Sequence, residues 1–310
     1  MAEAAHGRLA LGAWRSRRRR SRSARETRRL GFLMIVPALA VSGVLVLYPL
    51  VKGFNTSLHT GGAGTGLPSQ YVGFHNYSTG LSDPTTGQAI AHTALYLVIA
   101  LTIEITAGLF IAVTLQRAFR GRGIILAILI LPWALPSVVS GLLWRRVFDP
   151  QNGLLNHLLM DLHIIHDPQV WLAGAGAIPF ITLVHAWGVI PLVSLIFLAG
   201  LQAIPEEVYA ASAVDGATPF KQFRHITLPL LLPSLAVAAT VGTIAAINIF
   251  DEIYVLNGTA LNTRSFVMQV YNTTFIEANF SVGTALAFLV GGATALFGIL
   301  YTFAFRRATA

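Results

Sequence analysis

Residues 204–233 read IPEEVYAASAVDGATPFKQFRHITLPLLLP, and this polar stretch lies between two long apolar segments. Its acids, bases and turn residues are of the kinds that the hydrocarbon core of a bilayer excludes. Pro205 can begin a helix without losing a needed N–H group, and Glu206 and Glu207 then fall in the first turn, where acidic side chains favour the helix dipole. We therefore expect a short helix outside the apolar segments.

The same stretch contains a helix stop and a second start. Asp215-Gly216 can end the first helix, because glycine readily takes the left-handed conformation after a helix C-terminus. Thr218-Pro219 can begin another helix, with threonine as the cap and proline in the first position. The pattern predicts two short helices that meet at a bend, although these signals alone fit an ordinary interhelical loop equally well.

The composition is that of a membrane protein. Of the 310 residues, 55% are hydrophobic and 11% are charged, whereas soluble domains average about 25% charged residues. The absence of cysteine excludes disulfides, thiolate metal sites and cysteine nucleophiles. The formal net charge is +8, but ten of the 21 basic residues precede Leu30. Because apolar sequence follows at once, we expect these residues to orient the chain and to contact membrane lipid, and we expect no nucleic-acid partner.

Six apolar runs are long enough to cross a bilayer, whose hydrocarbon core requires about 20 helical residues. The first run, 30–50, is longer than the apolar core of a signal peptide and lacks a small-residue cleavage site, so we expect it to be retained. The chain is therefore predicted to be an all-α polytopic membrane protein, with spanning helices over 30–50, 90–115, 124–144, 178–201, 230–256 and 282–305.

The basic residues assign a side to each connection. Seventeen of them lie in the N-terminal tail, the 116–123 loop, the 202–229 loop and the C-terminal tail, whereas four lie elsewhere. By the positive-inside rule, both termini and the 202–229 loop are cytoplasmic. The predicted organisation is an Arg-rich tail over 1–29, a six-helix transmembrane domain over 30–305 and a short tail over 306–310. The four basic residues on the outer side are Lys52, Arg145, Arg146 and Arg264.

The polar stretch resembles the cytoplasmic loop of sugar-type, binding-protein-dependent permeases of bacterial ABC importers, whose pattern reads roughly I-P-x-E-L-Y-E-A-A-x-x-D-G-A, a spacer, then F-x-x-I-x-L-P. Residues 71–77, YVGFHNY, resemble the family's F-V-G-x-x-N-Y, and residues 144–156, WRRVFDPQNGLLN, resemble its W-x-x-x-F-x-P…G-x-x-N. The likeness covers most of residues 30–305. The matching loop positions are Ile204, Pro205, Glu207, Tyr209, Ala211, Asp215, Gly216, Ala217, Phe223, Ile226, Leu228 and Pro229.

This resemblance implies the type I ABC importer permease fold and a multi-pass protein of the bacterial plasma (inner) membrane. It also implies a second permease subunit, two ATP-binding cassette ATPase subunits and an extracytoplasmic solute-binding protein as partners. We do not expect the chain to be an enzyme or to bind a cofactor or metal itself, because the P-loop pattern G-x-x-x-x-G-K-[ST] is absent. ATP and Mg would be used by the partner ATPases.

The 202–229 loop would then receive the motion of the ATPases. Ala210 stands where the family has the glutamate of E-A-A, and Ser212 replaces its last alanine, so Glu207, one turn earlier, is the remaining carboxylate candidate. Gly216 is explained equally well by its role as a helix stop. The residues that we expect to form the ATPase contact or hold the bend are Glu207, Tyr209, Ala211, Asp215, Gly216, Ala217 and Lys221.

In this family the helices on either side of the loop line the translocation cavity. W-x-x-x-P before the loop and N-x-F-D-x-x-Y-x-L after it match Trp187, Pro191 and residues 248–256. Amide and carboxylate groups can bond sugar hydroxyls, and aromatic faces can cover apolar C–H surfaces. The resemblance assigns Trp187, Asn248, Phe250, Asp251 and Tyr254 to the cavity. His185 and Leu192 are added because they are neighbours of Trp187 and Pro191 on the same helix.

Other polar groups have simpler interpretations. Glu104, in the middle of the second run, is expected to be a buried, neutral packing group, and Glu252 is expected to be hydrated near the outer interface. Residues 257–263, NGTALNT, replace the family's Gly-Gly-Pro turn, which indicates a different contact with the binding protein. The scattered histidines form no convincing metal site.

We therefore expect the permease subunit of an ATP-driven ABC importer that moves a sugar or related polyhydroxylated solute, including glycerophospho-compounds, by alternating access. One alternative is an ion-coupled secondary transporter, with Glu104 or Asp251 as a relay and helices broken at Pro132–Pro136 and Pro191. The other is an intramembrane enzyme, for which neither H-E-x-x-H nor G-x-S-x-G is present.

Overall fold

The computed structural model describes residues 31–61 and 68–306, so the tail predicted over 1–29 and most of the one over 306–310 lie outside the described residues. The chain divides into two compact units, residues 1–55 and 56–310. The first contains most of a helix over Gly31–Ser57, with a π-helical turn at Gly43–Leu47 followed by α2 (Tyr48–Ser57). The most apolar part of this helix buries no residue within the chain. Its side chains therefore need lipid or another protein to cover them.

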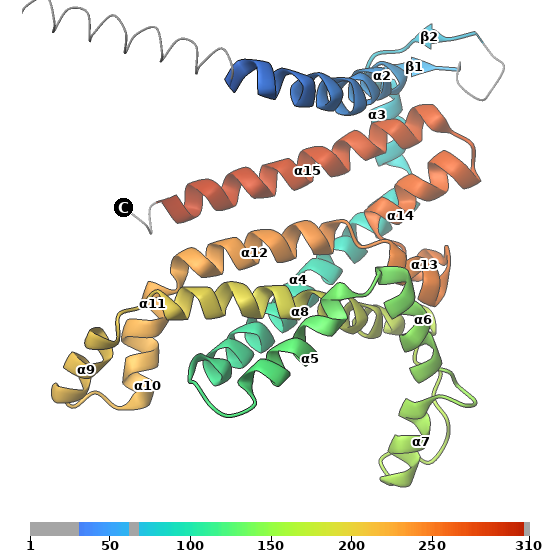
Figure 1. Cartoon of the computed structure of the whole chain (residues 1–310). Coiled ribbons are helices and arrows are strands. Elements are labelled where there is room, and N and C mark those ends of the chain that lie inside the picture. The colour runs from blue at the N-terminus through green and yellow to red at the C-terminus, as the bar shows by residue number, and fades with distance from the viewer. Residues whose placement is uncertain (1–30, 62–67, 307–310) are drawn as a thin grey trace, which may run out of the picture. The chain divides into compact units, whose positions relative to one another are not determined.

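The second unit is organised around α4 (Pro84–Gln116) and α8 (Ala177–Gln202), which pack along each other (Figure 1). Asp83 caps α4 by accepting a 2.8 Å hydrogen bond from the Thr85 N–H group. α12 (Leu232–Ile247) packs against both helices, and α15 (Phe280–Arg306) packs against α12. The fully buried core side chains include Tyr96, Ile178, Ile181, Phe197, Leu201, Leu231, Ile253 and Leu286.

The predicted all-α class is confirmed, with one short pair of strands as the exception among the described residues. Four helical segments are long and apolar enough to cross a membrane: Gly31–Ser57, Pro84–Gln116, Gly174–Gln202 and Phe280–Tyr301. Two bent pairs raise the number to as many as six. In one, α5 (Arg122–Ala134) and α6 (Ser137–Val147) meet at 99°, and in the other, Pro219–Leu230 and Leu232–Ile247 meet at 66°.

Two predicted spans are not continuous helices. The one predicted over 124–144 breaks at Leu135 and Pro136, which are extended, because proline lacks an N–H group and disfavours helix at the residue before it. The one predicted over 230–256 breaks after Ile247 and resumes as α13 (Asp251–Asn257). The side chain of Asn248 donates to the Ile244 carbonyl group at this break, which satisfies one of the carbonyl groups left free at a helix end.

The motif at residues 71–77 joins a two-stranded hairpin to the helix that follows it. β1 (His59–Thr60) and β2 (Gln70–Tyr71) are antiparallel, with His59 opposite Tyr71, and α3 (His75–Ser82) follows. The buried side chain of Asn76 donates to the carbonyl groups of Ser57 and His59, at 2.8 and 2.9 Å. Asn76 therefore closes the loop between the strands and the helix.

The motif at residues 144–156 has a similar structural role before α7 (Leu154–Asp161). A Cβ atom at Gly153 would clash with backbone oxygens of residues 147 and 149, so only glycine fits there. The amide of Asn156 donates to the carbonyl groups of Pro150 and Gln169 and accepts from the Gln169 N–H group and the Trp171 indole. These four bonds fix the segment around α7.

The remaining elements are short. Residues 204–231 contain three helices and a π-helical turn, and residues 261–276 contain one helix between a 3-10 turn and a π-helical turn. In order, they are α9 (Glu206–Val214), α10 (Pro219–Gln222), the π turn Phe223–Thr227, α11 (Leu228–Leu230), the 3-10 turn Leu261–Thr263, α14 (Phe266–Tyr271) and the π turn Asn272–Ile276. A further 3-10 turn, Gly174–Gly176, precedes α8.

Candidate functional site

The predicted pair of short helices at 204–229, the coupling loop, is confirmed as α9 and α10. α9 ends in a left-handed glycine, Gly216, with φ of 77°. The N–H groups of Gly216 and Ala217 donate to the carbonyl groups of Ala213 and Ser212, at 3.1 and 3.0 Å. This pair of bonds is a Schellman motif, which satisfies carbonyl groups that the helix end would leave free. Thr218 then caps α10, as its sequence position predicts.

Side-chain hydrogen bonds hold the two helices of the coupling loop together. The hydroxyl groups of Tyr209 and Thr227 lie 3.0 Å apart. The amide of Gln222, on α10, donates to the hydroxyl group of Ser212 at 2.9 Å and to the Tyr209 carbonyl group at 3.3 Å, both on α9. Ser212, which departs from the family pattern, is thus part of the link between the helices. These hydrogen bonds fix the position of α9 relative to α10 and the π turn.

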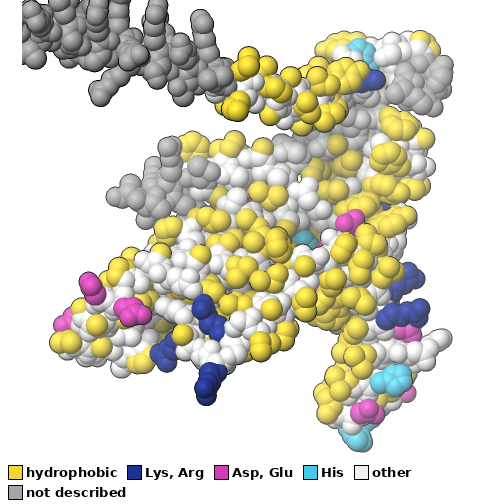
Figure 2. All heavy atoms as spheres, viewed as in Figure 1, with side chains coloured by type: hydrophobic (Ala, Val, Ile, Leu, Met, Phe, Trp, Pro, Cys, Tyr) yellow, Lys and Arg dark blue, Asp and Glu magenta, His cyan; other side chains and the backbone are white. Residues whose placement is uncertain are grey.

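The outer surface of the coupling loop mixes acidic and apolar side chains (Figure 2). Of the predicted contact residues, Tyr209 and Ala217 are half-buried, and Glu207, Ala211, Asp215, Gly216 and Lys221 are exposed. Sequence reasoning missed two others: Val214 is 88% exposed and Phe220 is 70% exposed. Their positions could have indicated this exposure, because Val214 directly precedes the helix stop at Asp215-Gly216 and Phe220 directly follows the helix start at Thr218-Pro219.

A cleft of about 950 Å³ lies between the coupling loop and the end of α4. It leaves part of the loop without packing against the helical bundle. Its lining combines the C-terminal turn of α4 with residues of α9, α10 and the π turn: Val113, Thr114, Gln116, Arg117, Ala118, Glu206, Tyr209, Pro219, Gln222, Phe223 and Thr227.

Most of the predicted cavity residues lie on accessible surface of α8 and around α13. Trp187, Leu192, Phe250 and Asp251 are half-buried, whereas Asn248 and Tyr254 are exposed. The rings of Phe250 and Tyr254 are stacked, with centroids 5.8 Å apart.

Sequence reasoning missed the continuation of this stack. Tyr271 packs edge-on against Phe250 and Tyr254, at 5.2 and 5.8 Å, and Phe275 lies 5.4 Å beyond Tyr271. We call Phe250, Tyr254, Tyr271 and Phe275 the aromatic row. Phe275 is 63% exposed, so the row presents aromatic faces to its surroundings.

His185 is placed differently from the other predicted cavity residues. It is buried, and its Nδ1 atom lies 3.1 Å from Oε1 of Glu252. Its Nε2 atom lies 3.8 Å from Oε1 of Glu104, which is fully buried, as predicted. The interpretation of Glu252 as a hydrated interfacial group was wrong, because its side chain turns inward to His185. The buried triad Glu104, His185 and Glu252 joins α4, α8 and α13.

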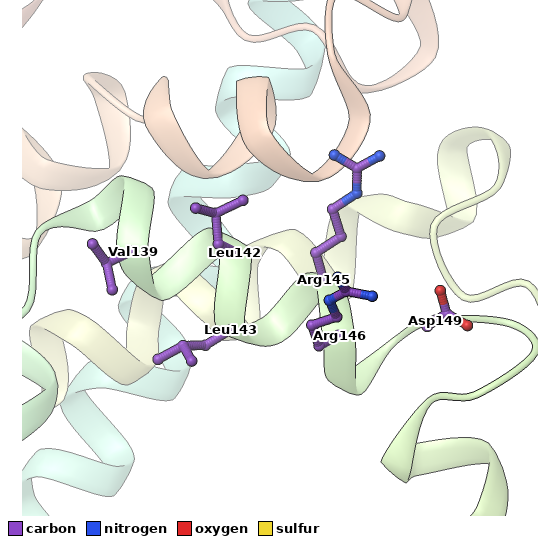
Figure 3. Close-up of a pocket in the computed structure, with 6 residues that line it drawn as sticks. All are labelled: Val139, Leu142, Leu143, Arg145, Arg146 and Asp149. Atoms are coloured by element: carbon purple, nitrogen blue, oxygen red, sulfur yellow. The ribbon is translucent and has the colours of Figure 1, made fainter.

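A second pocket, of about 590 Å³, lies along α6 and contains both signs of charge (Figure 3). Arg145 reaches toward the Val255 carbonyl group of α13, at 3.5 Å. The N–H groups of Asn152 and Gln151 donate to the carboxylate of Asp149 and lower its pKa. The lining residues are Val139, Leu142, Leu143, Arg145, Arg146 and Asp149.

Comparisons with known proteins agree with this architecture. The family model for binding-protein-dependent transport system inner membrane components matches residues 104–309. The trehalose/maltose transport system permease protein MalF of Thermococcus litoralis is 35% identical over 278 residues, which cover 88% of this chain and 92% of that protein. The trehalose transport system permease protein SugA of Mycobacterium tuberculosis is 29% identical over 274 residues, 88% of each chain.

The fold also matches that of a solved transporter. A chain in the crystal structure of a bacterial alginate ABC transporter, in complex with an alginate pentasaccharide-bound periplasmic protein, superposes with a TM-score of 0.79. The sequences are 19% identical, and the match covers 92% of this chain and 96% of that one. The family match, the relative at 35% identity and the shared fold lead to one conclusion: this chain is an ABC transporter permease, a multi-pass inner-membrane protein of the binding-protein-dependent transport system family.

Proposed function

We propose that this chain is one of two permease subunits of an ATP-driven importer for a sugar or a related polyhydroxylated solute, including glycerophospho-compounds. The main support for the proposal is the structure of the coupling loop. Hydrogen bonds between side chains hold its helices together, and Val214 and Phe220 are exposed at its surface. Exposed apolar side chains on a polar surface mark a protein contact. Because the loop connects α8 to α12, a displacement there passes directly into the helices of the bundle.

The partner at this loop is an ATP-binding cassette ATPase, one of two that bind and hydrolyse ATP with Mg. The P-loop pattern is absent from this chain, so the nucleotide site belongs to the ATPase subunits. Closure of the ATPases on ATP displaces the coupling loop, and the cavity between this chain and its partner permease then opens to the other side. The positive-inside count supports a cytoplasmic loop and cytoplasmic termini.

The sugar class is supported by the chemistry around α13. The aromatic row offers flat apolar faces, and Asn248 and Asp251 lie beside it with groups that can bond hydroxyls. Such pairing of aromatic faces with a few polar groups is typical of small-molecule sites. The names of the two relatives, which refer to trehalose and maltose, favour the same class. An extracytoplasmic solute-binding protein delivers the solute to the outer face.

Reconstitution of the full assembly tests this function. Proteoliposomes containing both permeases and both ATPases, with the binding protein outside, are assayed for radiolabelled trehalose and radiolabelled glycerol 3-phosphate. We expect uptake of one of these that needs both internal ATP and the binding protein. Uptake driven by an ion gradient without ATP would instead identify a secondary transporter. ATP-driven uptake of an amino acid, with neither labelled probe accepted, would overturn the solute class alone.

A further inference from the structure

The buried triad brings three ionisable side chains together inside the bundle. Glu104 comes from α4, His185 from α8 and Glu252 from α13, and all three are buried. The two nitrogens of the imidazole face different carboxyl groups, at 3.1 Å for Glu252 and 3.8 Å for Glu104. One contact is therefore a hydrogen bond, and the other is too long to be one.

Glu104 lacks the partners that a buried carboxylate needs. Within residues 31–61 and 68–306, neither of its oxygens has a hydrogen-bond partner, and the Nε2 atom of His185 has none either. Burying an ionised carboxylate without donors costs far more than burying a neutral acid. A Cβ atom at Gly242 of α12 would clash with the Glu104 carboxyl group, so the surroundings on that side are closely packed.

Charge balance decides how many protons the triad holds. One imidazolium neutralises one carboxylate, and the hydrogen bond pairs it with Glu252. The second carboxyl group is neutral only if it carries a proton. Within the described ranges, no group of three His, Cys, Asp or Glu side chains is arranged to hold a metal ion, so the ligand that fits here is a proton.

The other charged and titratable groups around the triad do not supply a second cation. On α4, the hydroxyl group of Tyr96 donates to the Thr263 carbonyl group. On α6, Arg145 reaches the Val255 carbonyl group. Asp251, next to Glu252 on α13, adds only negative charge. α8 has no titratable residue besides His185, and α12 has none.

We propose that Glu104, His185 and Glu252 form a buried proton-binding site, in which Glu104 is a neutral carboxylic acid beside a His185–Glu252 ion pair. The site connects α8, which leads into the coupling loop, with α13, which carries Phe250 and Tyr254 of the aromatic row. Loss of the proton leaves the triad with one uncompensated negative charge in a buried and closely packed region, where such a charge is costly. Transport therefore depends on the site remaining protonated.

Infrared spectroscopy of the purified assembly in lipid tests the protonation state directly. Spectra of wild type and Glu104→Gln are compared at neutral pH in water and in heavy water, with Asp161→Asn on exposed α7 as a control. We expect a carbonyl band of a protonated carboxyl group that shifts in heavy water, disappears in Glu104→Gln and persists in the control. Loss of carboxylate absorption in Glu104→Gln, with no such band in wild type, would overturn the proposal. If Glu104→Gln does not assemble, the wild-type protein is titrated to alkaline pH instead. Loss of the carbonyl band at alkaline pH then supports the proposal, and absence of the band at every pH overturns it.

The second arm measures transport and rests on the proposed function, whereas the infrared arm does not. ATP-driven uptake by wild type is expected to fall as external and internal pH are raised together. Glu104→Gln should transport within about twofold of wild type at neutral pH, because glutamine is a neutral group of the same shape, and its alkaline decline should be smaller. The pH dependence of ATP hydrolysis is measured separately for the ATPase subunits without the permeases, and the uptake rates are corrected for it. An identical alkaline decline in Glu104→Gln and wild type would contradict the role in transport even if the infrared band is present.

Discussion

The hydroxyl group of Tyr209 lies 3.0 Å from that of Thr227, so the first helix of the coupling loop is tied to the turn that leads back into the bundle. The two side chains are 18 positions apart in the sequence. Together with the Gln222–Ser212 bond, this contact ties α9 to both α10 and the π turn that follows it.

Removing this contact should weaken coupling more than folding. Tyr209→Phe and Thr227→Val each delete one hydroxyl group, and each is expected to destabilise the loop by about 1 kcal/mol. Solute transported per ATP hydrolysed should fall in both variants, and the double variant should be no worse than either single one, because both remove the same bond. Strictly additive losses would show that the two hydroxyl groups act separately.

The exposed apolar residues of the coupling loop should lie against an ATPase subunit. The chain contains no cysteine, so a single Val214→Cys or Phe220→Cys variant carries one reactive thiol. We expect a short bifunctional reagent to cross-link each to an ATPase subunit in membranes, whereas Asp161→Cys on α7 should give no such product. Cross-linking from Asp161 alone would place the ATPases on the opposite side.

Phe220 also permits an affinity measurement. Burying a phenylalanine side chain contributes about 1.5–3 kcal/mol, so Phe220→Ser is expected to weaken ATPase binding by roughly 10- to 150-fold. Titration of purified ATPase against the permease pair in detergent measures this change. Thr102→Ser, at an exposed position of α4, serves as a control that should bind as wild type does.

The aromatic row should set the apparent affinity for solute. Tyr254→Ala removes a ring that stacks on Phe250, and Tyr254→Phe keeps the ring without its hydroxyl group. Uptake assays should give a higher KM for Tyr254→Ala, by about 5- to 10-fold for a lost contact of about 1 kcal/mol, and a smaller change for Tyr254→Phe. Equal effects of the two substitutions would assign the role to the hydroxyl group rather than to the ring.

Asn156 should control the order of the segment around α7, which is predicted to lie on the outer side of the membrane. Asn156→Ala removes four hydrogen bonds and leaves the Gln169 N–H group and the half-buried Trp171 indole without their partner, and each lost hydrogen bond costs about 1 kcal/mol. We expect protease added from the outer side to cut between residues 157 and 170 faster than in wild type. Asn152→Ala, whose side chain is exposed, is the matched control.

Local signals predicted much of this structure. Pro205, Asp215-Gly216 and Thr218-Pro219 determine α9, its end and α10 through backbone preferences that act within a few residues. A break at Pro132–Pro136 was expected only for the alternative of a secondary transporter, and the break after Ile247 was not predicted, because the apolar composition runs through both. Hydropathy measures whether a segment can enter a membrane and does not report where its backbone changes direction.

The buried triad could not be predicted for a different reason. His185 and Glu252 are 67 residues apart in sequence, and only the packing of α13 against α8 brings them together. We expected Asp251 to line the cavity and Glu252 to be hydrated near the outer interface. Consecutive helical residues point about 100° apart, so Asp251 remains half-exposed while Glu252 is buried. Val214 and Phe220 were overlooked because an isolated apolar residue in a polar loop is usually unremarkable.

The most direct test of force transmission through the coupling loop uses two glycines in turns that the positive-inside rule predicts to be cytoplasmic. Gly216 and Gly121 both have left-handed backbones, with φ of 77° and 89°, and both have open space where a Cβ atom would lie. Gly216→Val and Gly121→Val therefore impose similar local strain, roughly 1–2 kcal/mol, but only the first disturbs the Schellman turn of the coupling loop.

ATP-driven solute uptake is measured for both variants in proteoliposomes, together with ATPase activity and the amount of assembled complex. We expect Gly216→Val to lose most uptake while assembly stays normal, and Gly121→Val to transport close to the wild-type rate. Wild-type uptake per ATP in Gly216→Val would contradict the role of the coupling loop.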